Sequence, residues 1–145
     1  MIAAHVLPVS AAALVNPLVR LSGAVAAVER IYDVRYGWTD ASRAVGDRVD
    51  FLRRATEIAT AEPALLVVSD EDDYPEFRAD AEALERELAS RYRDRSRVRL
   101  RRVPGMPHPL AEPPGVEPAP QNVHAVAVDA AFTSWFTEHL TSPAR

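Results

Sequence analysis

The chain has 145 residues, of which 48% are apolar and 26% charged, and it contains no cysteine. This size and composition fit one globular domain with its own core, and they exclude disulfides, thiolate metal sites and a cysteine nucleophile. The net charge of −4 argues against a nucleic-acid partner, and no apolar run is long enough for a membrane span. Residues 1–19 are apolar, but Pro8 and Pro17 interrupt them and no basic residue precedes them, so we expect no signal peptide. We therefore expect a soluble, cytoplasmic protein.

Two short apolar runs next to prolines predict buried strands. AAALV (11–15) lies between Pro8 and Pro17, and ALLVV (64–68) follows Pro63. Apolar runs of this length are typical of parallel strands that are buried on both faces.

The residues between these strands have helical periodicity. After a predicted cap at Thr39 or Asp40, a second apolar series follows the first. The two series, each on one helical face, are Val25, Val28 and Tyr32, and Val45, Val49 and Leu52. We expect a helical insertion over about 23–60.

The sequence of the second half of the chain predicts a helix, a strand, a loop and a second helix, in that order. The segment RVRLRRV alternates as a strand does, and the arginines of 91–102 are expected on a solvated edge. Two apolar stripes at helical spacing are Phe77, Ala81, Leu84, Leu88 and Tyr92, and Val128, Phe132, Trp135, Phe136 and Leu140. Because a strand–helix–strand unit crosses over right-handed, we expect an α/β fold with a mostly parallel sheet in a three-layer αβα arrangement.

Two loops follow neighbouring predicted strands and carry the candidate chemistry. Residues 104–120 hold seven of the twelve prolines and place His108 between two of them, which restricts its backbone. The acidic stretch SDEDD (69–73) follows the ALLVV strand. Since the carboxyl ends of parallel strands form one edge of a sheet, we expect His108 beside Asp73 or Asp72 there. A carboxylate that accepts from an imidazole N–H fixes its tautomer, as in nucleophilic hydrolases.

The segments PALLVVSDEDD, AEALERELASRY, VRLRRVPGMPH and AVDAAFTSWFTEHL resemble the C-terminal half of an α/β-hydrolase of the bacterial serine esterase and prolyl-oligopeptidase-like kind. The resemblance covers about residues 1–140. It implies that His108 is the general base of a catalytic triad, and that Asp73, or Asp72 in a turn one residue shorter, is the acid. Where the family usually has glycine in that turn, Ser69 and Asp70 stand here.

The family's nucleophile motif G-x-S-x-G is absent from these 145 residues. The serines are Ser10, Ser22, Ser42, Ser69, Ser90, Ser96, Ser134 and Ser142. The opening MIAAHVLPVSAAALVNP resembles the helix and strand that follow the nucleophile in this family. We therefore expect the nucleophile and the oxyanion-hole donors to be missing from this chain.

Several other residues invite a functional interpretation. The family's insertion forms a cap over the substrate, where Tyr32, Tyr36 and Trp38 could line an acyl pocket, although we favour core packing for them. SDEDD with His108 could bind a divalent cation, but we favour a solvated acidic turn. His5, His124 and His139 lack metal-ligand spacing.

Two functions remain. The first is a serine hydrolase of ester or peptide bonds to which this chain contributes acid and histidine, without a cofactor, and which is inactive alone. The second is a non-catalytic α/β module that binds a partner chain through an exposed sheet edge. Neither involves nucleic acid or a membrane.

Overall fold

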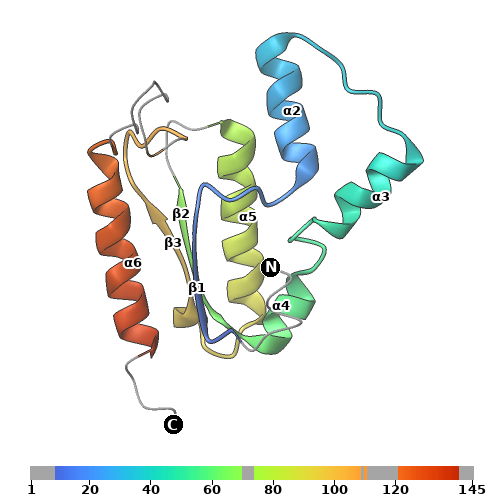
Figure 1. Ribbon diagram of the computed structural model, residues 1–145. Helices are drawn as coiled ribbons and strands as arrows, with labels where there is room; N and C mark the ends of the chain where they lie inside the picture. The colour runs from blue at the N-terminus through green and yellow to red at the C-terminus, as the bar shows by residue number, and fades with distance from the viewer. Residues whose placement is uncertain (1–8, 70–73, 109, 111–120, 141–145) are drawn as a thin grey trace.

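The computed structural model describes residues 9–69, 74–108, 110 and 121–140 (Figure 1). In chain order the elements are β1 (Ala11–Val15), α2 (Leu21–Tyr32), α3 (Asp40–Arg48), α4 (Ala55–Ala61), β2 (Ala64–Ser69), α5 (Pro75–Arg91), a 3-10 turn (Arg95–Arg97), β3 (Val98–Arg102) and α6 (His124–Leu140). Among these described residues, none of the helices is both long and apolar enough to cross a membrane.

The three strands form one parallel sheet in the order β1-β2-β3. Ala11 pairs with Ala64, and Leu65 pairs with Val98. All six residues of β2 are buried, which confirms the expectation for ALLVV. The same expectation is wrong for AAALV, because β1 is an edge strand and its five residues are only half-buried.

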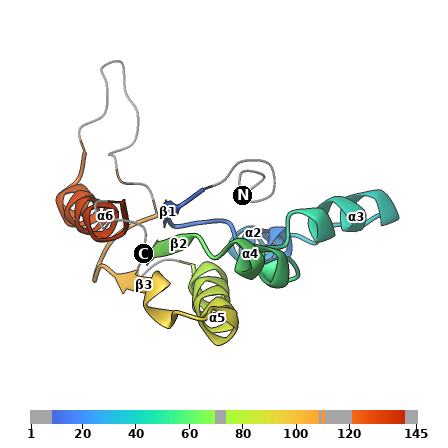
Figure 2. The same cartoon turned by 90° about the horizontal axis from the view of Figure 1, so that it is seen from below.

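Helices cover both faces of the sheet, which confirms the α/β class. Figure 2 shows α6 on one side of the strands and α5 on the other. The α5 side is packed around Leu65, Val67, Leu84, Leu88 and Val98, and α4 adds Ala55 and Ile58. The α6 side is packed around Leu66, Val68, Met106, Val128 and Trp135. Burying side chains of this size contributes about 1.5–3 kcal/mol each, so these two clusters dominate the stability of the fold.

Helix α5 begins with Pro75 at its first turn, where proline costs no hydrogen bond. Its predicted stripe is confirmed, since Ala81, Leu84 and Leu88 are buried. The stripe continues into Tyr92, whose hydroxyl donates to the Pro63 carbonyl at 3.0 Å. Burial raises the pKa of Tyr92 to about 12, so it stays a neutral donor.

The segment between β1 and β2 is helical, as its periodicity predicts, but its three helices differ in burial. Helix α4 joins the core, whereas α3 has no buried residue and extends away from the sheet (Figure 1). Helix α2 packs on α5 through Gly23 and Ala27.

The expected apolar face of α2 does not face the core. Val28 is 48% exposed and Tyr32 is 70% exposed. Core packing is therefore wrong for Tyr32 and also for Tyr36, which is exposed and makes an edge-on ring contact with the half-buried Trp38 at 4.9 Å. The small residues of α2 face α5 instead, and two ion pairs, Arg20–Asp80 and Arg30–Glu76, join the helices at both ends of the contact.

The predicted solvated edge is β3. Arg99, Arg101 and Arg102 are exposed on it, while Val98 is buried. Opposite this strand, α6 buries Val128 and Trp135 as expected, but Leu140 at its end is 56% exposed.

Candidate functional site

The carboxyl ends of the three strands are joined by backbone hydrogen bonds into one edge. The Asn16 N–H donates to the Val68 carbonyl at 2.9 Å, and the Val103 N–H donates to the Ser69 carbonyl at 3.0 Å. The segments that follow β1, β2 and β3 therefore leave the sheet side by side, which is where ligand sites form in open parallel sheets.

A tight turn after β3 positions His108. Gly105 has φ 72°, a left-handed conformation that glycine adopts without strain, and the Met106 N–H donates to the Val103 carbonyl at 3.1 Å. The Met106 side chain is fully buried in the α6-side core. Because Met106 is anchored and Pro107 has a fixed φ, the backbone enters His108 in a defined direction.

The imidazole of His108 lies against aromatic rings at the beginning of α5. It stacks on Phe77 at a centroid distance of 5.4 Å with the planes 24° apart, and the Tyr74 ring lies 5.6 Å away. Tyr74 and Phe77 also contact each other at 5.4 Å. These ring contacts hold one side of the imidazole. His108 is nevertheless exposed, so solvent reaches the residue.

Asn16, at the end of β1, holds the backbone of the same loop. Its side-chain Nδ2 donates to the His108 carbonyl at 2.9 Å. The residue has φ 41°, a left-handed conformation that asparagine tolerates better than most residues. Its Oδ1 is buried, and no donor within the described part of the chain reaches it. This leaves a buried acceptor beside the histidine loop.

The expected acid, Asp73 or Asp72, belongs to the segment of the sequence between β2 and α5. Asp72 and Asp73, with the rest of 70–73, lie outside the described residues, and so does the predicted contact with His108. Their neighbours in sequence are described. Ser69 ends β2 at the site edge, and Tyr74 contacts His108 directly.

The sequence predicts His108 as a site residue but does not predict Asn16, Tyr74 and Phe77 as its surroundings. Its spacing predicts Phe77 only as a member of the apolar core stripe of α5. The Asn-Pro pair after a predicted strand was a turn signal that could have singled out Asn16. Nothing in the sequence indicates Tyr74 as a site residue except its position next to the acidic stretch 69–73.

The other candidate ligands do not assemble in the described residues. No group of three or more His, Asp or Glu side chains that could hold a metal ion occurs in that part of the chain. His124 and His139 lie at opposite ends of α6, as expected, and His139 packs on Trp135 at 4.0 Å.

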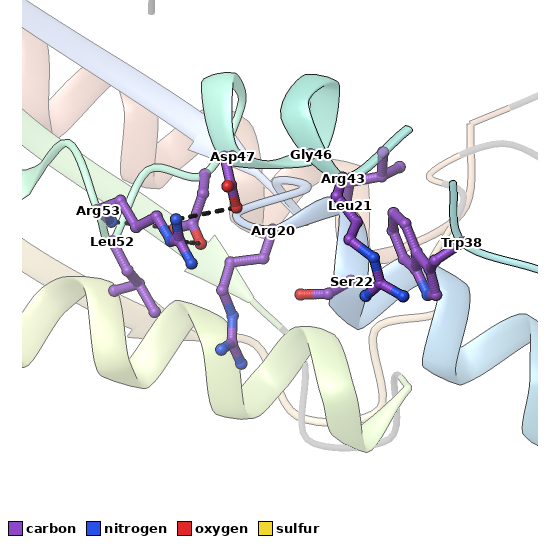
Figure 3. A pocket seen from close by; sticks show the side chains of 10 residues that line it. Arg20, Leu21, Ser22, Trp38, Arg43, Gly46, Asp47, Leu52 and Arg53 are labelled. Carbon is purple, nitrogen blue, oxygen red and sulfur yellow. Dashed lines mark hydrogen bonds and ion pairs between the residues drawn. The ribbon is translucent and has the colours of Figure 1, made fainter. Parts of the chain in front are cut away.

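A separate cavity of about 710 Å³ lies within the helical insertion (Figure 3). Its polar wall includes Arg53, whose Nη1 lies 3.0 Å from Asp47 Oδ1. Arg20 at its edge is bound by the Asp80 carboxylate, and that hydrogen bond raises the pKa of Arg20. None of the residues around His108 lines this cavity. The residues that do are Arg20, Leu21, Ser22, Trp38, Arg43, Gly46, Asp47, Asp50, Leu52 and Arg53.

Comparison of the chain with protein-family models, with curated proteins and with solved structures finds no match. We therefore infer the function from the site's own geometry and from the motifs in the sequence.

Proposed function

We propose that this chain supplies the acid and the histidine of a serine hydrolase of the α/β-hydrolase type. His108 is the general base, and Asp73 or Asp72 is the carboxylate that orients it. The observation that carries the proposal is the packing of His108 on Tyr74 and Phe77. In the sequence the acidic segment lies between Ser69, which ends β2, and Tyr74, whose ring contacts the imidazole.

The surroundings of His108 suit a base whose ring must keep one orientation. Stacking on Phe77 limits rotation of the imidazole, and the Asn16 hydrogen bond fixes the backbone that carries it. A carboxylate on one ring nitrogen would leave the other nitrogen to take the proton of an attacking hydroxyl and return it to the leaving group. The substrate class is an ester or a peptide, and the serine hydroxyl must come from outside these 145 residues.

The orienting contact can be tested by NMR of the imidazole nitrogens. We expect Asp73→Asn, or Asp72→Asn, to move the nitrogen resonances of His108, because loss of the carboxylate changes its hydrogen bond and tautomer. The His108 signals are assigned from their loss in His108→Gln. Asp129→Asn on the exposed face of α6 is the matched control and should leave them in place. Unchanged His108 signals in both Asp72→Asn and Asp73→Asn would contradict the proposed pair.

A second candidate is a non-catalytic module that binds another chain. One observation favours it: β1 is an edge strand with half-buried apolar residues and no charged side chain. If the chain is such a module, His108→Ala should leave binding of the other chain unchanged. If the chain is part of a serine hydrolase, the same substitution should abolish hydrolysis once the serine is supplied.

A further inference from the structure

The two edges of the sheet are built differently. β3 presents Arg99, Arg101 and Arg102 to solvent. Residues 9–16, which include β1, contain no charge, proline or glycine. Proteins protect open strand edges with charges, prolines and bulges, because an unprotected edge pairs with other strands. By this criterion β3 is protected and β1 is not.

The hydrogen-bond pattern identifies which groups of β1 point outward. The Ser10 carbonyl accepts from the Ala64 N–H, and the Asn16 N–H donates to the Val68 carbonyl, both at 2.9 Å. In a parallel pair, alternate residues direct both backbone groups toward the neighbour, so residues 10, 12, 14 and 16 face β2. The N–H and C=O groups of Ala11, Ala13 and Val15 therefore point away from β2, to the side of β1 on which the described residues place no further strand.

Within the described residues, the apolar clusters on both faces of the sheet end at β1 in side chains that are only partly buried. On the α6 side, Ala13, Val15 and Phe136 are only partly buried. On the α5 side, Leu14 and Phe51 are also partly buried. A further strand beside β1 would cover apolar atoms on both faces as well as pair the backbone groups.

We propose that β1 pairs with β1 of a second copy of this chain, antiparallel and centred on Ala13. Three features favour a second copy. The outward residues Ala11, Ala13 and Val15 are symmetric about Ala13, so one register pairs Ala13 with its own copy and Ala11 with Val15. The two central side chains are small, and the absence of charge on β1 avoids repulsion between identical strands.

The same register sets the symmetry of the assembly. A two-fold axis midway between the two copies of Ala13 and perpendicular to the sheet gives an isologous interface, the commonest kind in homodimers. It keeps both α6 helices on one face and gives a continuous six-stranded sheet. Pairing through β3 would bring Arg99, Arg101 and Arg102 of two copies together. This inference does not depend on the proposed hydrolase chemistry.

The first test is the molar mass of the full chain in solution, measured by sedimentation equilibrium. We expect the 15.9 kDa chain to form a dimer, and Ala13→Pro to sediment as a monomer. Proline at position 13 removes an outward N–H but no hydrogen bond to β2, and edge strands tolerate proline at such positions. Ala13→Ser keeps the N–H and should remain a dimer. Circular dichroism checks that each variant is folded.

The second test does not rely on a proline variant. Because the chain has no cysteine, a single introduced cysteine is unique. Under mild oxidation, Ala13→Cys should form a covalent dimer, and Arg101→Cys on the protected edge should not. A monomeric wild-type chain at about 100 μM, a dimer that persists in folded Ala13→Pro, or cross-linking of Arg101→Cys instead of Ala13→Cys would overturn the proposal. A monomer would leave the β1 edge to a different chain.

Discussion

His139 shows how burial determines the charge of one residue. Its ring packs on Trp135, and its Nε2 is buried without a hydrogen-bond partner in the described part of the chain. Burial lowers its pKa from 6.5, although the Glu138 carboxylate 3.8 Å from Nε2 acts in the opposite direction. The histidine therefore stays neutral in the folded protein at a pH where the unfolded chain already binds a proton.

This difference predicts a loss of stability in mild acid. Since the unfolded state binds more protons below about pH 6.5, the free energy of unfolding should fall as the pH drops through that range. The substitution His139→Phe, which keeps a ring beside Trp135, should make the decrease shallower. Urea unfolding between about pH 7 and pH 5 measures how the free energy of unfolding changes with pH, and His124→Phe is the control. Equal slopes for wild type and His139→Phe would contradict the assignment.

At the scale of elements, the contact between α2 and α5 depends on a glycine. A Cβ at Gly23 would lie 2.5 Å from Asp80 Oδ2. Asp80 is 1% exposed, and its other oxygen accepts from Arg20 Nε at 2.9 Å, so the carboxylate has little freedom to move. Its Oδ2 has no hydrogen-bond partner among the described residues and lies against the helix backbone.

We expect Gly23→Ala to destabilise the protein by about 1 kcal/mol. Overpacking costs about 1–3 kcal/mol, and the better helix propensity of alanine offsets up to about 1 kcal/mol of that cost. In an Asp80→Ala background the clash is gone, so the same change should become stabilising. Gly37→Ala, with no atom within 4 Å of its Cβ position, is the control and should be neutral. Thermal unfolding of the four variants checks the reversal of sign.

The same elements show what the sequence could predict. Apolar runs and helical spacing identified β1, β2 and α5, because local patterns determine element type. They did not distinguish the central β2 from the edge strand β1, since an apolar run does not reveal how many neighbours a strand has. They also assigned the wrong face of α2. Its buried face is made of Gly23 and Ala27, and small residues that permit close packing carry almost no hydrophobic signal.

For the whole molecule, the parallel topology explains why the position of His108 at the carboxyl edge of the sheet was predictable. The order of strands alone placed the loop of His108 at the carboxyl edge, next to the end of β2. The contacts with Asn16, Tyr74 and Phe77 join residues from three parts of the chain, so no sequence spacing could have revealed them. The fold therefore positions a candidate base, whereas the sequence contains no G-x-S-x-G motif that would supply the nucleophile.

This arrangement predicts that residues 1–145 alone do not hydrolyse esters or peptides through an organised site. An acid and a base activate a hydroxyl but cannot replace it, because the serine oxygen forms the acyl-enzyme. The 145 residues contain no G-x-S-x-G, the turn that exposes the serine and supplies part of the oxyanion hole. Loss of a single oxyanion donor already costs about 10²–10³ in rate.

The measurement combines an activated short-chain ester with a serine-reactive fluorophosphonate probe, applied to the purified chain and to His108→Ala. We expect no covalent labelling and no turnover that depends on His108. Weak turnover that is equal in both proteins is consistent with this expectation, because surface histidines can accelerate hydrolysis of activated esters without an organised site. Labelling of a serine together with loss of turnover in His108→Ala would refute the prediction, since it would identify one of the chain's eight serines as a nucleophile within reach of His108.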